Sequence, residues 1–300
     1  MRILCADVRV AGKPHHDWKE GYELMYAFRA LGHTCEVAGP NGFRYTELDI
    51  PRIAWNYDLI IITDNYPQYS GWKWWDWASI KTPKLFWAID THLIDYRPFI
   101  RNAQIGYVAF NIPSDMKNYG HPRSFWMPYA VSTIHHNIAG TFPKEYDTVF
   151  IGSLTVSARR KEMCDRFNIK HMSVFGEDYF KEMKRSKICF NLSISNDINA
   201  KYFEIMGSGS FMLTNYNQEL VDFFDGSPDL QACMYKTDDE IGEKIKYYLE
   251  HEDEREAIAK RLYDYVWKYH SWEARCQTIL SHVQSRPVKI EVNPLSWLRV

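Results

Sequence analysis

The sequence predicts an α/β protein built from two Rossmann-like, doubly wound domains that face a cleft. Three observations predict this class. The chain has 300 residues, which at about 150 residues per domain is the length of two domains. Short apolar segments alternate with amphipathic ones, as strands and helices do in a parallel sheet covered by helices. The alternation breaks once near the middle of the chain and then restarts.

The first alternation occupies the first third of the chain. Residues 57–64 form a nearly continuous β-branched run, which is typical of a parallel strand buried on both faces. Residues 20–31 carry apolar side chains at helical spacing, and Gly32 follows where a left-handed C-cap is expected. We predict the strands of this domain at residues 2–8, 33–38, 57–64, 84–90 and 105–110.

The second alternation follows a polar stretch that contains Gly140 and Pro143. From Asp238 onward the pattern is helical, and we interpret Asp238 and Asp239 as acids at a helix start, where they complement the helix dipole. We predict strands at residues 147–153, 171–175, 187–192 and 211–214, with a helix around 203–206. The predicted division is a first domain at 1–132, a second domain at 133–270, and a C-terminal helix and tail at 271–300 that return to the first domain.

Composition excludes several classes of protein. An apolar fraction of 46% and a charged fraction of 25% are ordinary for a folded chain and exclude wholesale disorder. A net charge of −2 excludes binding to nucleic acid or membrane by bulk positive charge. We see neither a signal peptide nor an apolar run of the roughly 20 residues that a membrane span needs. The six scattered cysteines are expected to be buried thiols, so we expect a cytoplasmic protein.

The loop after residue 151 is the first candidate binding site, because ligands of open α/β sheets bind at the carboxyl ends of the strands. It contains Gly152 and Ser153, followed by Arg159 and Arg160. Glycine permits close approach of the backbone, hydroxyls and amides at a helix start bind anions, and arginines add positive charge. The loop therefore suits a diphosphate. The alternative interpretation is a turn with solvated arginines.

A second candidate site follows the strand predicted at residues 187–192. Lys201 and Glu204 lie three residues apart at a helix start, so they share one helix face. A carboxylate there can accept hydrogen bonds from a ribose diol, and a nearby cation can neutralise a phosphate. The alternative is an exposed ion pair, which contributes little to stability.

The first domain offers Asp90 and His92, which end or follow the strand predicted at residues 84–90. Asp90 is a candidate base or substrate ligand, and His92 a candidate contact to the sugar or to developing charge. Alternatively, each of them caps a helix. Residues 72–77 contain four tryptophans. We expect most of these rings in the core, with one helix face left as a plate that stacks on a sugar or a base. The loop after the first strand lacks G-x-G-x-x-G, which argues against a nucleotide-dependent dehydrogenase or epimerase.

Several segments together resemble one known family. Residues 187–192, 201–209 and 213–215 look like the donor-site signature of GT-B glycosyltransferases, and the closest subset is the CgeB-like, spore-maturation-type family of glycosyl transferases group 1. Residues 149–153 with the two arginines after them, and the final segment 269–280, are similar to the same family. The resemblance covers about residues 145–281, and its specificity lies in the order and spacing of the motifs.

The resemblance implies transfer of a sugar from a nucleotide-diphosphate donor, UDP-linked, to an acceptor hydroxyl with retention of configuration. Glu204 would bind the ribose, and Lys201 with Arg159 or Arg160 the diphosphate. Lys201 stands where the family usually has arginine, and Asp197 where many retaining members have a second acid. Cations and helix N-termini would stabilise the leaving group, so neither a metal nor a cofactor is expected. The implied donor-binding residues are Gly152, Ser153, Arg159, Arg160, Asn191, Asp197, Lys201, Tyr202, Glu204, Gly207 and Gly209.

The acceptor has several candidates. A glycan, a lipid-linked sugar or a protein is one group, and a hydroxylated base in DNA is another, because compact GT-B proteins of this size occur in phages. A protein that binds a sugar nucleotide or glycan without turnover is a further alternative, since a fold does not guarantee activity.

Overall fold

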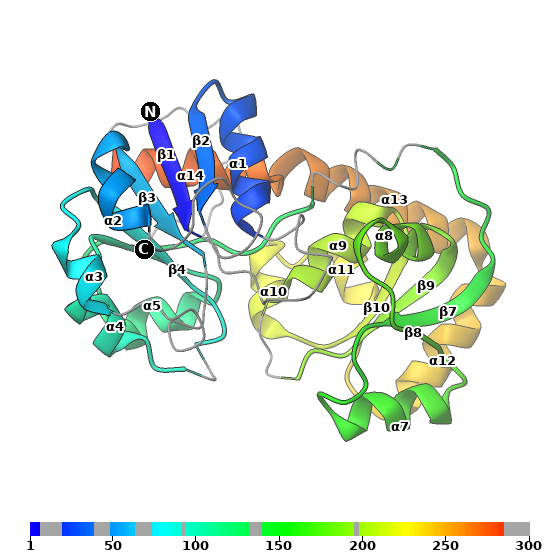
Figure 1. The fold of residues 1–300 in the computed structure, drawn as a ribbon. Helices are drawn as coiled ribbons and strands as arrows, with labels where there is room; N and C mark the ends of the chain where they lie inside the picture. Colours follow the sequence, from blue (N-terminus) through cyan, green and yellow to red (C-terminus); the bar gives the residue numbers. More distant parts are fainter. Residues whose placement is uncertain are drawn as a thin grey trace. The chain divides into compact units, whose positions relative to one another are not determined.

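A computed structural model describes residues 1–6, 20–38, 49–63, 74–91, 94–132, 138, 140–194 and 198–284; for residues 74–76 it describes the backbone only. Within these residues the chain forms two compact units. The first comprises residues 1–128 together with 272–284, and the second comprises residues 129–271. Each unit is an α/β layer structure, and Figure 1 follows the alternation of strands and helices by colour.

The first unit is built on an all-parallel sheet in the order β2-β1-β3-β4-β5-β6. The chain places β2 on one side of β1 and the later strands on the other side, beginning with β3. The carboxyl ends of β1 and β3 are therefore the topological switch point. Every position of β3 and β4 is buried, as expected for strands covered on both faces. The strands are β1 (Arg2–Ala6), β2 (Thr34–Ala38), β3 (Leu59–Ile62), β4 (Lys84–Ala88), β5 (Tyr107–Phe110) and β6 (Ser124–Trp126).

Helices cover this sheet, and Gly32 ends the first of them with φ +82°, the left-handed C-cap that the sequence predicts. Of the predicted tryptophan cluster, Trp77 is buried in the core, whereas Trp72 lies outside the described residues. The helices are α1 (Glu20–Ala30), α2 (Ile50–Ile53), the 3-10 turn η2 (Ala54–Asn56), α3 (Trp74–Ser79), α4 (Arg97–Asn102), α5 (Pro113–Tyr119) and α14 (Trp272–Val283).

Helix α14 is far from this unit in sequence but packs within it. Figure 1 shows it in orange beside the blue α1, and the Cys276 thiol contacts the Leu24 carbonyl oxygen at 3.8 Å. The ring of Trp272 meets that of Trp87 edge to face at 5.6 Å. The buried Arg275 donates from Nε to the carbonyl oxygen of Pro128 at 2.8 Å. These contacts bury the last helix against the first sheet.

The second unit has a parallel sheet in the order β11-β10-β9-β7-β8, with its switch point between β7 and β9. The strands are β7 (Tyr146–Ile151), β8 (Lys170–Met172), β9 (Ser186–Asn191), β10 (Phe211–Asn215) and β11 (Met234–Tyr235). The helices are α7 (Ala158–Arg166), α8 (Gly176–Lys184), α9 (Ala200–Ser208), α10 (Gln218–Phe223), α11 (Pro228–Ala232), α12 (Asp238–Glu250) and α13 (Glu252–Tyr269).

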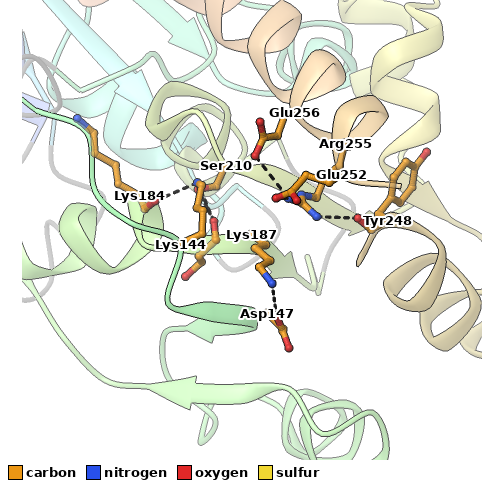
Figure 2. A network of polar contacts seen from close by, with 10 residues as sticks. Lys144, Asp147, Lys184, Lys187, Ser210, Tyr248, Glu252, Arg255 and Glu256 are labelled. Atoms are coloured by element: carbon orange, nitrogen blue, oxygen red, sulfur yellow. Dashed lines mark hydrogen bonds and ion pairs between the residues drawn. The ribbon is translucent and has the colours of Figure 1, made fainter. Parts of the chain in front are cut away.

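A polar network holds the amino ends of these strands together (Figure 2). The Lys144 ammonium donates to the carbonyl oxygens of Lys184 and Ser186, both at 2.9 Å, and to the Ser210 hydroxyl at 3.1 Å. These acceptors lie just before or at the first residues of β9 and β10. One ammonium therefore holds the amino ends of both strands together, at the edge of the sheet opposite their carboxyl ends. Figure 2 also shows the Lys187–Asp147 ion pair and the buried Arg255 with Tyr248, Glu252 and Glu256.

The six cysteines are free and buried, as the sequence predicts. The two strands that the sequence analysis missed, β6 and β11, have three and two residues. Such short segments show no period from which a strand can be recognised. In the part of the chain that the structure describes, every helix is too short or too polar to cross a bilayer.

Candidate functional site

A hollow of about 430 Å³ lies at the carboxyl edge of the second sheet, within the range that small-molecule sites occupy. Its walls come from the start of α7 and from the segments that follow β9, β10 and β11. The position agrees with the rule that places ligands of open α/β sheets outside the carboxyl ends of the strands. The lining residues are Ser157, Arg159, Leu192, Ser193, Ile194, Asn215, Tyr216, Tyr235, Lys236 and Asp238.

The loop after β7 leads into the hollow through Gly152, the predicted glycine. Its φ is +151°, and a Cβ placed there would lie 2.8 Å from Nζ of Lys201. The backbone conformation therefore favours glycine, and a side chain at this position would displace the neighbouring ammonium. The Ser153 hydroxyl lies 2.8 Å from the Thr155 hydroxyl and accepts from the Thr155 amide at 3.2 Å, so it shapes the loop locally.

The start of α7 faces the hollow with Ser157 and Arg159. Ser157 is the N-cap, and within the described residues no side chain caps this helix, so its first amides keep the anion-binding character of a helix N-terminus. Arg159 forms an ion pair with Asp238 in the first turn of α12. Asp238 thus begins a helix, as predicted, and in addition positions an arginine at the hollow.

Arg160 connects the segments after β7 and β9. Its Nε and Nη2 donate to the carbonyl oxygen of Leu192 at 3.3 and 3.1 Å, and Nη1 donates to that of Ser153 at 3.4 Å. The guanidinium also lies over the Phe150 ring, 5.5 Å from its centroid. The interpretation of two solvated arginines is wrong for Arg160, which clamps backbone carbonyls, and incomplete for Arg159, which is half-exposed but ion-paired.

Asn215, the last residue of β10, continues the sheet beyond its strands. Its Oδ1 accepts from the Ser193 amide at 2.8 Å, and its Nδ2 donates to the Ser193 carbonyl at 3.3 Å. A side-chain amide thereby replaces a backbone partner and holds the Leu192–Ser193 segment against β10. This contact positions the wall of the hollow that carries Ile194.

Lys201 lies in the first turn of α9 and points back to β7. Its ammonium donates to the carbonyl oxygen of Ile151 and lies 4.8 Å from the Phe150 ring centroid. Burial is the main cause that lowers the pKa of Lys201 to about 8, the nearby Arg160 lowers it further, and Glu204 opposes both. The ammonium is thus a partly desolvated cation beside the Gly152 loop.

Glu204 lies one turn further along α9 and is half-buried. Its Oε2 accepts a hydrogen bond from the Tyr179 hydroxyl on α8 at 2.7 Å. Burial and the carboxylate raise the pKa of Tyr179 well above its usual value, so the phenol stays a donor. The simple alternative of a solvated Lys201–Glu204 pair is wrong, because each group has a partner on another element. Neither residue lines the hollow itself.

Four other predicted residues do not line the hollow. Gly207 and Gly209 sit at the C-terminal end of α9, and the closeness of their backbone to a donor stays a prediction. The Gly207 carbonyl accepts from Trp267, and Gly209 is a C-cap with φ +77°. Asn191 donates to the buried Thr214 hydroxyl at 3.3 Å, and Tyr202 is buried. Asp197 and His92 fall outside the described residues.

Asp90 follows β4 in the first unit with φ +54°, a conformation that non-glycine residues seldom adopt. Its carbonyl accepts from the Ile94 amide at 3.3 Å, and the next residue, Thr91, hydrogen-bonds to Asp115. Strained backbone of this kind is common at functional sites and motivates a functional hypothesis.

Sequence reasoning missed most of the hollow's lining after β10 and β11. Tyr235 ends a two-residue strand and Lys236 follows it, whereas Asn215 belongs to the motif at residues 213–215 but was not predicted as a site residue. The rule on carboxyl ends identifies such residues once the strand before them is known. The strand β11 is recognised only from its pairing with β10 in the folded chain.

A model of the glycosyl transferase-like family matches residues 130–281, just over half of the chain. The chain therefore belongs to the glycosyl transferase-like family. The match spans β7 to α13 and most of α14, and so includes the whole hollow. A comparison with curated protein sequences found no significant match.

Solved structures resemble the chain over nearly its full length. A DNA-modifying β-glucosyltransferase, studied with and without uridine diphosphoglucose, has TM-score 0.65 and 13% identity over 95% of this chain and 100% of its own. The T4 phage β-glucosyltransferase with UDP and Mn²⁺ has TM-score 0.67 and 13% identity, over 94% of this chain and 99% of its own. An α-glucosyltransferase with UDP and a mismatched 13-mer DNA has TM-score 0.67 and 10% identity, over 95% of this chain and 100% of its own. These likenesses confirm the predicted fold class, two Rossmann-like units of the GT-B type.

Proposed function

We propose that the protein transfers a sugar from a UDP-linked donor to an acceptor hydroxyl, without a metal ion and with retention of configuration. The observation that carries this proposal is the hollow, where an uncapped helix start and Arg159 meet an aromatic wall at the carboxyl edge of the sheet. An anionic diphosphate fits the first part and a nucleoside the second. Similar structures named as glucosyltransferases hold UDP or act on uridine diphosphoglucose, which supports UDP. Within the family, we propose the CgeB-like subset.

The residues around the hollow suggest how a donor is held. Lys201 and Arg159 neutralise the diphosphate, the start of α7 adds its amides, and Glu204 binds the ribose hydroxyls. During transfer the acceptor oxygen bonds to the anomeric carbon on the face from which the diphosphate leaves, which retains the configuration. The bond from that carbon to the diphosphate breaks, the diphosphate takes the electron pair, and the proton of the acceptor hydroxyl passes to the departing diphosphate or to Asp90. The cations stabilise that charge. Asp90 and His92 serve the acceptor, as a base or as acceptor ligands.

A thermal-shift screen of nucleoside diphosphates tests the donor. Because a ligand that binds only the native state stabilises it, UDP at a hundred times its dissociation constant adds about 2.7 kcal/mol to the free energy of unfolding. We expect UDP to raise the melting temperature by several degrees, and ADP and GDP to have smaller effects. If no nucleoside diphosphate shifts the transition, the proposed function is wrong. If UDP binds but is never released from any UDP-sugar, the protein is a binding module. Assays with EDTA and with added Mn²⁺ test metal independence.

A hydroxylated base in DNA is the second candidate acceptor. The observation that favours it is the likeness to glucosyltransferases described as DNA-modifying or solved with DNA, which extends over both chains. Transfer to duplex DNA with hydroxymethylated bases, and a steep loss of that transfer with added salt, would support this acceptor over a glycan. Transfer only to a glycan, lipid-linked sugar or protein would exclude it.

The pKa of Lys201 predicts how donor binding depends on pH. Since burial lowers this pKa to about 8, the ammonium is charged below pH 8 and loses its proton as the pH rises through that value. Binding of the anionic diphosphate favours the charged form, so the affinity for UDP should fall above pH 8, by at most about tenfold per pH unit. Calorimetric titrations at pH 7, 8 and 9 measure this. Lys201→Arg keeps its charge throughout and should give a flat profile; an equal decline in both proteins would contradict the assignment.

A further inference from the structure

Tyr235 lines the hollow and carries a buried hydroxyl. It is the last residue of β11, is 3% exposed, and its ring stacks on that of Phe190 with centroids 5.9 Å apart and planes at 13°. Its hydroxyl is buried, and among the described residues nothing hydrogen-bonds to it. A buried hydroxyl without a partner is unfavourable and uncommon in native proteins. Because Tyr235 lines the hollow, a bound molecule is the natural partner.

The surroundings make this hydroxyl a donor. Burial raises the pKa of Tyr235 far above its usual value, so the phenol keeps its proton at any physiological pH. The acid that lines the hollow is Asp238, which is already paired with Arg159 and whose carboxylate lies 3.9 Å from the Arg166 guanidinium. The other charged side chain of the wall, Lys236, is a cation over the Tyr216 ring. The Tyr235 hydroxyl therefore acts toward a ligand as a hydrogen-bond donor.

The sheet order indicates which part of a nucleotide reaches Tyr235. Lys201 and Arg160 lie against Phe150 on β7. Tyr235 ends β11, which is separated from β7 by β9 and β10. Three strand spacings place the backbones of β7 and β11 about 14 Å apart. A nucleoside diphosphate whose phosphates lie near the β7 loop therefore extends its base toward β10 and β11.

From this geometry we propose that the Tyr235 hydroxyl donates a hydrogen bond to a carbonyl oxygen of the donor's base and selects uracil over cytosine. Pyrimidines differ at ring position 4, where uracil, like thymine, has a carbonyl acceptor and cytosine an amino donor. A hydroxyl that donates satisfies the carbonyl of uracil and opposes the amino group of cytosine. This inference rests on the proposed function, because it assumes a nucleotide in the hollow.

The test compares UDP and CDP binding by calorimetry in the unaltered protein and in Tyr235→Phe. We expect the unaltered protein to bind UDP at least tenfold more tightly than CDP. Tyr235→Phe should weaken UDP binding about five- to tenfold, leave CDP within twofold, and so reduce the selectivity. The free protein should not lose stability, since the variant removes a buried hydroxyl without a partner; its melting temperature should stay the same or rise.

Tyr248→Phe is the matched control. Tyr248 is a buried tyrosine on α12 whose hydroxyl donates to the Ala232 carbonyl at 3.4 Å, away from the hollow. Its loss should lower the melting temperature slightly and leave both affinities unchanged. If Tyr235→Phe behaves in the same way, or weakens UDP and CDP equally, the proposed role of Tyr235 is overturned. If the unaltered protein binds neither UDP nor CDP, the proposed function fails as well, so the two failures are distinguishable.

Discussion

Replacing Glu204 by alanine is expected to weaken the binding of UDP about tenfold to a hundredfold, the usual value of hydrogen bonds to a charged group. The carboxylate lies on α9 one turn from Lys201, and the Tyr179 hydroxyl at 2.7 Å holds one of its oxygens in place. A carboxylate so oriented suits the two hydroxyls of a ribose. Calorimetric titration with UDP measures the effect, and unchanged affinity would show that Glu204 is not a donor ligand.

Two variants separate the charge of Glu204 from its structural contact. Glu204→Gln keeps an oxygen that accepts from Tyr179 but removes the charge, so it should fold normally and still bind UDP more weakly. Glu177→Ala removes an exposed glutamate on α8 that pairs with Lys181, and it should leave UDP affinity unchanged. A loss of affinity in Glu177→Ala would indicate a general effect of removing negative charge from this unit.

Gly152→Ala is expected to reduce both stability and donor binding. At φ +151° an alanine is strained by about 1–3 kcal/mol. Its Cβ would lie 2.8 Å from Nζ of Lys201, so the ammonium has to shift from its place beside the Ile151 carbonyl. We expect UDP affinity to fall about tenfold or more, because a charged hydrogen-bonding group is displaced. Thermal unfolding and calorimetry of the same preparation measure the two effects.

Gly209→Ala is the control for backbone strain. Gly209 is also left-handed, with φ +77°, but a Cβ there meets only the Tyr263 ring at 3.6 Å. This variant should lower the melting temperature to a similar extent and leave UDP binding intact. If both glycine variants weaken UDP binding equally, the effect of Gly152 comes from general destabilisation and not from Lys201.

The fold was predictable because its signals are local. The buried run in β3, the amphipathic helix α1 and its Gly32 cap each lie within a few consecutive residues, and the structure places all three as expected. The strands β6 and β11 were missed because two or three residues do not form a pattern. Their pairing with β5 and β10 creates them, and pairing is a contact between distant segments.

The candidate site was predictable only in part for the same reason. The sequence places Gly152, Arg159, Lys201 and Glu204 after strands, and the carboxyl-end rule brings them to one edge. The rule does not say where each side chain points. Lys201 turns to the Ile151 carbonyl, and Arg160 clamps Leu192. Gly207 and Gly209 show the same limit, because they lie at the C-terminal end of α9, whereas Lys201 lies at its start.

Residue order alone thus specified two doubly wound sheets, the loops that carry the chemistry, and the resemblance to glycosyltransferases, since periodicity and motif spacing are properties of neighbouring residues. The partners of Arg159, the amide bridge of Asn215 and the solitary hydroxyl of Tyr235 emerged from folding. Each depends on burial and on distances between segments tens of residues apart, and these quantities exist only once the chain has packed.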